Sequence, residues 1–204
     1  MSITIAATKT NLLKTKRTLE LCKEGYQLLD EKRKILLMEI SSTTALVEKI
    51  QKETHNILEK VYEAFEKALF SMGKTKIESI IAGIDTRFYL DIGEKRTMGT
   101  IVPEISLRID ENLPFFSPIG ISPNVDEVIF LIRQALEKII KLAEKKNTLL
   151  RLEQEFNRTT KKVNALEKIH IPYYSELVRN ITERLDEESR EAFATLKEIK
   201  KRIA

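Results

Sequence analysis

The sequence of 204 residues contains no tryptophan, eight phenylalanines, six glycines and five prolines. So few large aromatic side chains leave little to fill a wide core, and so few glycines and prolines argue against a compact, loop-rich globule. Charged residues make up 32% of the chain, a composition typical of long helices that carry a narrow apolar seam. We therefore expect a mainly α protein in which most burial occurs between paired helices.

Cysteine and long apolar runs are also scarce. Cys22 is the one cysteine, so an internal disulfide is excluded. The first residues lack the continuous apolar run of a signal peptide, and apolar runs such as Ile35 to Met38 are far shorter than the roughly 20 residues that cross a bilayer. We predict a cytoplasmic protein with no direct membrane insertion, whose association with a membrane would go through partners.

The first half of the chain carries a heptad seam, in which mostly small or apolar residues recur at alternating spacings of three and four. The seam positions are Leu12, Thr15, Leu19, Cys22, Tyr26, Leu29, Arg33, Leu36, Ile40, Thr43, Val47, Ile50, Thr54, Ile57, Val61, Ala64 and Ala68. A helix of about 57 residues would be roughly 85 Å long, far beyond a globular helix, so it needs a partner along its length.

The second half supplies that partner. Ser122 is a plausible N-cap and Pro123 a plausible first helical residue. We expect the seam to run through Val125, Ile129, Ile132, Leu136, Ile139 and Ala143, then to shift by about one residue to Leu149, Leu152, Phe156, Val163, Leu166, His170, Tyr173 and Leu177, followed by Ile181 and Leu185. Such a shift is typical of a local change of winding or of a change of partner.

Five of the six glycines lie between the two helices, where both helices should end. Phe88, Leu90 and Ile92 alternate with polar residues, residues 93–99 should form a turn, and a second alternating stretch follows, which predicts a β-hairpin with Pro103 at an edge. The expected organisation is an N-terminal coiled-coil helix (1–71), a small head with the hairpin (72–121) and an antiparallel C-terminal coiled-coil helix (122–204).

No motif predicts catalysis or cofactor binding. The string from Ala68 to Thr75 resembles a phosphate-binding loop, but Ala68 replaces its first glycine and a helix precedes it, so Gly73 is better explained as a helix C-cap. His55 and His170 have no second histidine or cysteine at ligand spacing, so no metal site is predicted; His170 should be packed or hydrogen-bonded. Acidic residues such as Asp186 lie among bases at helical spacing, as in exposed ion pairs.

Pro172 falls well inside the second helix. It removes a backbone donor and crowds the carbonyl group of Lys168. We therefore expect a kink or local unwinding near residues 168–172, at a cost of about 3 kcal/mol unless the partner helix compensates.

Both ends of the chain are basic. Residues 1–19 hold four bases and no acid, and the last stretch holds Lys197, Lys200, Lys201 and Arg202 with one acid, Glu198. A nucleic-acid binder would carry such a basic stripe too, but charge is nearly balanced along both helices and no reading motif is present, so we predict no nucleic-acid partner. Basic chain ends are commonly just solvated.

Two stretches, residues 11–36 and residues 159–172 with a continuation over residues 183–202, resemble the D subunit of the V/A-type ATPases and ATP synthases. Residues 163–167 read Val-Asn-Ala-Leu-Glu and are followed by Ile171-Pro172, the most specific part, and the similarity continues from Glu183 to Arg202. The matching positions in the first helix are Leu13, Lys16, Arg17, Gly25, Leu28, Leu29, Lys32 and Arg33. Cys22, Asp30 and Lys34 depart from the family pattern without affecting the coiled coil.

The resemblance implies a non-catalytic central rotor shaft that transmits torque between a membrane ring and a hexamer of catalytic A and B subunits. It also implies a small F subunit on the side of the shaft and a C (or d) subunit that links the shaft to the ring, which would make the protein peripheral to the membrane. We take Lys14, Lys16, Arg17, Lys197, Lys200 and Lys201 as candidate contacts with the hexamer. A free-standing coiled-coil scaffold or adaptor is the alternative that composition and heptads support equally.

Overall fold

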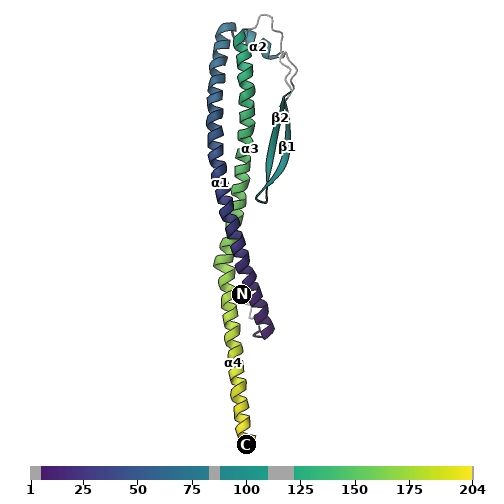
Figure 1. Ribbon diagram of the computed structural model, residues 1–204, viewed down its shortest axis with the longest axis vertical. Helices are drawn as coiled ribbons and strands as arrows, with labels where there is room; N and C mark the ends of the chain where they lie inside the picture. Colours follow the sequence, from purple (N-terminus) through teal and green to yellow (C-terminus); the bar gives the residue numbers. More distant parts are fainter. Residues whose placement is uncertain (1–5, 83–87, 110–121, 204) are drawn as a thin grey trace. The chain divides into compact units, whose positions relative to one another are not determined.

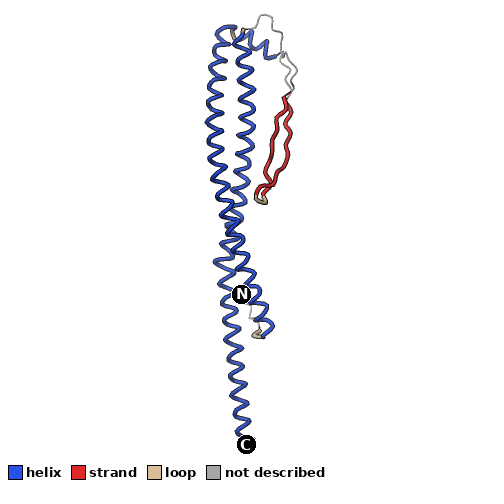
Figure 2. The backbone as a smooth tube through the Cα atoms, in the orientation of Figure 1, coloured by secondary structure: helices blue, strands red, loops and turns tan. Residues whose placement is uncertain are grey.

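The computed structural model describes residues 6–82, 88–109 and 122–203, and these ranges are mainly helical. Along the chain the elements are α1 (Lys9–Met72), α2 (Lys74–Ala82), β1 (Phe88–Thr97), β2 (Thr100–Ile109), α3 (Pro123–Ala165), the π-helical turn η1 (Leu166–His170) and α4 (Ile171–Ile203) (Figure 1). Two long helical segments with an antiparallel hairpin between them confirm the predicted fold class. Figure 2 shows how completely helix dominates the backbone.

The chain divides into two compact units. The terminal unit joins Met1–Ile35 to Phe156–Ala204, so both chain ends belong to it, and the central unit is Leu36–Glu155. Each long helical segment contributes to both units. The predicted boundaries of the head, residues 72 and 121, therefore fall within the central unit.

Local signals set the helix ends. Thr8 caps α1, since its side-chain oxygen accepts a hydrogen bond of 3.2 Å from the Asn11 N–H group. At the other end Gly73 has φ 76° and donates its N–H to the Leu69 carbonyl oxygen at 2.9 Å, the left-handed C-cap that glycine adopts most readily. Ser122 precedes α3, which begins at Pro123 as predicted.

The heptad seam of α1 is confirmed, because all of its predicted positions are buried or half-buried. Leu36 is completely buried. Two buried threonines of the seam satisfy their hydroxyl groups within the helix, Thr15 donating to the Asn11 carbonyl oxygen and Thr54 to that of Ile50, each at 2.7 Å. Small side chains at such positions allow the two helices to approach closely.

The predicted seam of α3 is wrong at three positions in its first turns. Ile132, Ile139 and Ala143 are exposed. One uninterrupted heptad pattern of buried or half-buried residues instead runs through Val128, Leu131, Ala135, Lys138, Leu142, Lys145, Leu149, Leu152, Phe156, Thr159, Val163 and Leu166. The predicted positions Val125, Ile129 and Leu136 flank it and are also buried or half-buried. The prediction failed because Lys138 and Lys145 occupy seam positions, where a lysine buries its stem and keeps its ammonium group near water.

The shift in the seam was predicted between Ala143 and Leu149, but the structure has it further along the chain. After Leu166 the next half-buried residue is Ile171, five positions on, and the seam continues through Tyr174, Val178, Ile181 and Leu185. That five-residue step coincides with the π turn, in which the Ile171 N–H donates to the Leu166 carbonyl oxygen. A π turn adds one residue to a helical turn, so it absorbs the shift. His170 and Tyr173 are consequently exposed, not in the seam.

The π turn ends one residue before the Ile171-Pro172 pair. Its wider winding is a local unwinding of the helix at the segment where Pro172 cannot donate to the carbonyl group of Lys168. A bend of the helix axis at Pro172 remains a prediction.

The turn of the hairpin is shorter than the predicted turn of residues 93–99. β1 and β2 pair antiparallel from Phe88 with Ile109 to Thr97 with Thr100, so only Met98 and Gly99 form the turn. Both have positive φ, 51° and 77°, as a type I′ turn requires. Gly93 lies inside β1 opposite Glu104, and Pro103 lies in β2, one of the two edge strands of this sheet.

Where the first long helix ends, the central unit has a small apolar core. Ala64 and Ala68 of α1, Ile77 of α2 and Val125 and Val128 of α3 are all buried together. Gly73 lets the chain leave α1 and start α2 at once, which brings Ile77 back against the helix pair. The core thus fixes the head end of α1 to the first turns of α3.

Candidate interaction surfaces

Two features that the sequence raised, a metal site and a phosphate-binding loop, can be checked in the described ranges. Among them, no group of three or more His, Cys, Asp or Glu side chains could hold a metal ion. The string that resembles a phosphate-binding loop consists of the end of α1, Gly73 and the start of α2, so it lacks the strand that precedes a true phosphate loop. His170 is exposed, which corrects the expectation of a packed histidine.

No helix within the described residues is both long and apolar enough to span a bilayer. Cys22 is half-buried in the seam of α1, as expected for a structural thiol.

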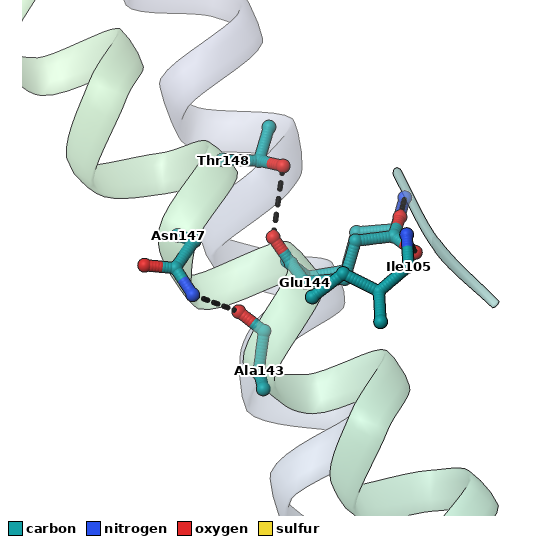
Figure 3. Close-up of polar contacts among 6 residues, drawn as sticks. Ile105, Ala143, Glu144, Asn147 and Thr148 are labelled. Carbon is teal, nitrogen blue, oxygen red and sulfur yellow. Dashed lines mark hydrogen bonds and ion pairs between the residues drawn. The ribbon is translucent and has the colours of Figure 1, made fainter. Parts of the chain in front are cut away.

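In the central unit, the hairpin is fastened to α3 by polar contacts to its backbone. The Ile105 N–H of β2 donates to Glu144 Oε2 at 3.3 Å, and Arg151 Nη1 donates to the Ile101 carbonyl oxygen at 2.8 Å. Figure 3 shows the Glu144 side chain beside Ile105, with Thr148 donating to the Glu144 carbonyl oxygen. These contacts satisfy backbone groups on an edge strand that would otherwise be open.

Val102 of β2 also belongs to this attachment, because its side chain is buried and only 4% of its surface is exposed. Beside it a groove of about 660 Å³ separates the hairpin from the helix pair and is lined by residues of α1, the hairpin and α3, including Glu39, Lys95 and Lys145. No sequence signal marked Glu144 and Arg151 as anchors, because both look like members of a solvated charged face.

The other strand of the hairpin exposes an apolar surface. Phe88, Leu90 and Ile92 alternate along β1 and are exposed by 50%, 57% and 67% of their surface. Alternate residues of a strand share one face, so the three form one patch. An apolar patch at the surface of a soluble protein commonly marks contact with a partner.

A second apolar feature lies against the small core of the central unit. A cavity of about 120 Å³ is lined entirely by apolar side chains of α1, α2 and α3. Ile81 and Ile132, two of its lining residues, are exposed by 57% and 45%. This end of the central unit is therefore incompletely covered by the described residues.

In the terminal unit, the basic groups near the two chain ends do not lie side by side. Lys14, Lys16 and Arg17 are exposed on the early turns of α1, and Lys197, Lys200 and Lys201 are exposed near the end of α4. Figure 1 shows α4 continuing well beyond the start of α1. The two groups therefore lie at different levels along α4, and their role in hexamer contact stays a prediction.

The part of α4 beyond Leu185 has no cover among the described residues. Every residue from Asp186 to Arg202 is exposed, a stretch of about 25 Å at 1.5 Å per residue. Phe193, Leu196 and Ile199 are among them, exposed by 73%, 64% and 48%. We call Asp186–Arg202 the C-terminal stretch.

Asp30, a residue that departs from the family pattern, is the centre of an ion-pair cluster on α1. It contacts Arg33, three residues on, and Lys34, whose Nζ atom lies 2.9 Å from Asp30 Oδ2. The hydrogen bond from Lys34 is the largest cause that lowers the pKa of Asp30 below its ordinary value. The contact with Asp30 also holds Arg33 at its seam position.

Comparison with known proteins agrees with the resemblance seen in the sequence. The family profile described as the D subunit of ATP synthase matches residues 11–201. The V-type ATP synthase D subunit of Thermotoga neapolitana is 31% identical over 203 residues, covering 99% of this chain and all of the relative. The A-type ATP synthase D subunits of Thermococcus sibiricus and Pyrococcus abyssi are 31% and 32% identical, each covering 96% of this chain and 93% of the relative. This chain therefore belongs to the family of ATP synthase D subunits.

Proposed function

We propose that the chain is the central rotor shaft of a V/A-type ATPase or ATP synthase, a non-catalytic component that transmits torque between an ion-translocating membrane ring and the catalytic hexamer. The observation that carries this proposal is the family match over nearly the whole chain. The seam supports it, because side chains packed between two long helices along their length resist twisting.

Torque requires that a shaft turn as one body while its surface differs from side to side. Charged side chains at the seam help to keep one helix from sliding along the other, since Lys138 of α3 reaches Glu53 of α1 at 2.6 Å. The hairpin on α3 makes the surface of the central unit unequal around its axis. An unequal surface outside the hexamer would let the stalk partners on the membrane side hold the shaft without slipping.

We assign the terminal unit to the inside of the hexamer of A and B subunits, and the head to the side that faces the membrane ring through the C (or d) subunit. Exposed bases near both chain ends would meet acidic loops of the hexamer. Each exposed ion pair contributes only about 0–1 kcal/mol. Such weak contacts would let the shaft rotate against the hexamer. The small F subunit would bind at the side of the helix pair.

The first test is co-expression with the A and B subunits of the same genome, followed by native mass spectrometry and an ATPase assay. We expect one copy of this chain per hexamer and an altered rate of ATP hydrolysis. An intact hexamer that leaves this chain unbound would contradict the proposal and favour a free-standing scaffold.

A second test addresses the contacts. Neutralising Lys14, Lys16, Arg17, Lys197, Lys200 and Lys201 to glutamine should weaken binding to the hexamer and make it less sensitive to added salt, because the charge attraction that salt screens is already gone. A matched control neutralises six exposed lysines of the central unit: Lys49, Lys52, Lys60, Lys67, Lys74 and Lys76. Equal binding by both variants would rule out the terminal bases as contacts.

A further inference from the structure

The apolar pattern of α4 continues into the C-terminal stretch. Leu185 is half-buried, and Ala192, Leu196 and Ile199 follow it at helical spacing, yet these three are exposed. A helix with an apolar stripe is stable in water when the stripe is packed against another element. The stretch therefore has the pattern of a paired helix without a partner among the described residues.

Charge is divided sharply along the same stretch. Its first half contains four acids and one base, namely Asp186, Glu187, Glu188, Glu191 and Arg190. Its second half contains four bases and one acid, namely Lys197, Lys200, Lys201, Arg202 and Glu198. A parallel copy of this helix would place like charges together, whereas an antiparallel copy would place each half beside its opposite.

We propose that the C-terminal stretch of the free chain pairs antiparallel with the C-terminal stretch of a second copy. The favoured register places Ala192 of each copy opposite Leu196 of the other. At 100° per residue, the charged side chains that flank the stripe most closely then meet opposite charges of the other copy: Asp186 lies beside Lys200, and Glu188 lies beside Arg202. These flanking pairs are attractive in the antiparallel orientation, in which the acidic half of each copy lies beside the basic half of the other.

The same register brings Phe193 near its own counterpart at the centre of the pair. Phe193 flanks the stripe and is 73% exposed in the single chain, so pairing would cover part of the one aromatic ring of the stretch. Aromatic side chains at the centre of a contact contribute strongly to binding. The existing Arg202 to Glu198 ion pair, 3.7 Å long and exposed, is weak enough to exchange for the new contacts.

The dimer should be weak. The contact is a single pair of short helical stretches, and association must offset the loss of translational and rotational freedom. We expect a dissociation constant on the order of 1–100 µM, with the charges selecting orientation more than adding affinity. Pairing of the free chain does not depend on the rotor assignment.

The experiment is sedimentation velocity of the full chain over a concentration series, with two charge-reversed variants. One variant is Asp186→Lys with Glu188→Lys, and the other is Lys200→Glu with Arg202→Glu. We expect the unsubstituted chain to dimerise, and each variant alone to dimerise at least about tenfold more weakly because its two halves then carry like charge. An equimolar mixture of the two variants should regain dimerisation, since all flanking charges are again opposite.

Matched controls carry the same charge changes in the central unit. Glu63→Lys with Glu66→Lys, and Lys60→Glu with Lys67→Glu, alter exposed residues and should dimerise like the unsubstituted chain. Circular dichroism checks that each variant keeps its helix content. A monomer at every concentration, dimerisation unaffected by the C-terminal reversals, or a mixture that stays monomeric would each overturn the proposal.

Discussion

Lys138 of α3 and Glu53 of α1 join the two helices of the central unit, with Lys138 Nζ 2.6 Å from Glu53 Oε2. The hydrogen bond from Lys138 is the largest cause that lowers the pKa of Glu53 below its ordinary 4.5. A carboxyl group whose folded pKa is lowered stabilises the fold above its unfolded pKa, and that contribution is lost as the pH falls through the folded value.

Replacing Lys138 with methionine should therefore reduce the free energy of unfolding at neutral pH, and the difference from the unsubstituted chain should shrink as the pH falls below 4.5. Urea unfolding followed by circular dichroism at neutral and acidic pH measures this. Lys141→Met is the matched control at an exposed position of the same helix. A difference that persists unchanged in acid would contradict a stabilising role for the ion pair between Lys138 and Glu53.

Leu152 and Leu150 differ by two positions on α3 and are 0% and 54% exposed. Leu152→Ala should destabilise the chain by about 2–5 kcal/mol, because it removes buried methyl groups and leaves a cavity. Leu150→Ala should change the free energy of unfolding by no more than about 0.5 kcal/mol. Urea titration of both variants checks this, and similar losses at both positions would contradict the observed seam.

The glycines at positions 25 and 73 should respond oppositely to alanine. Gly73 has φ 76°, where a Cβ atom is strained, so Gly73→Ala should destabilise by about 1 kcal/mol. Gly25 lies within α1 and an added Cβ meets nothing within 4 Å, so Gly25→Ala should stabilise by about 0.5–1 kcal/mol. Thermal unfolding of the two variants gives the signs, and a shared sign would refute one of the two assignments.

The carboxylate of Glu144 should protect the Ile105 amide from exchange with solvent, since it accepts that N–H group. Glu144→Ala should speed hydrogen exchange across β2 (Thr100–Ile109), because a part-buried contact between hairpin and helix is lost. Mass spectrometry of the exchanged peptides measures it. Glu137→Ala, at an exposed position of the same helix, should leave β2 unchanged, and equal effects of both substitutions would exclude a specific anchor.

The sequence predicted the fold where mostly apolar and small residues mark the buried face, as along α1 from Leu12 to Ala68, in which Arg33 is the one charged seam residue. It misplaced the first turns of α3, because Lys138 and Lys145 are buried along their stems while Ile132 and Ile139 are exposed. Hydropathy ranks these residues in the reverse order. A lysine in a seam is understood only with its acidic partner, and Glu53 lies 85 residues away along the chain.

The hairpin was predictable as a pair of strands, but its attachment was not. Met98 and Gly99 form the turn with positive φ. Methionine seldom adopts positive φ, so the sequence does not indicate a two-residue turn at this place. Glu144 and Arg151 hold the hairpin by contacts to backbone atoms, so no pairing of side-chain types in the sequence points to them. Composition identified the basic groups at the two chain ends. Their separation along α4 was not predictable, because it depends on where α1 begins relative to the end of α4.

The one extra residue of the π turn at Leu166–His170 keeps the seam residues that follow it on the same face of the helix as those that precede it. Deleting one residue there would let the helix wind regularly while Val163 and Ile181 keep their inward directions. Tightening the turn without a deletion would rotate everything after it by about 100° and bring exposed Tyr173 inward in place of Tyr174. One surplus residue thus sets which face of the 33 residues of α4 is presented outward.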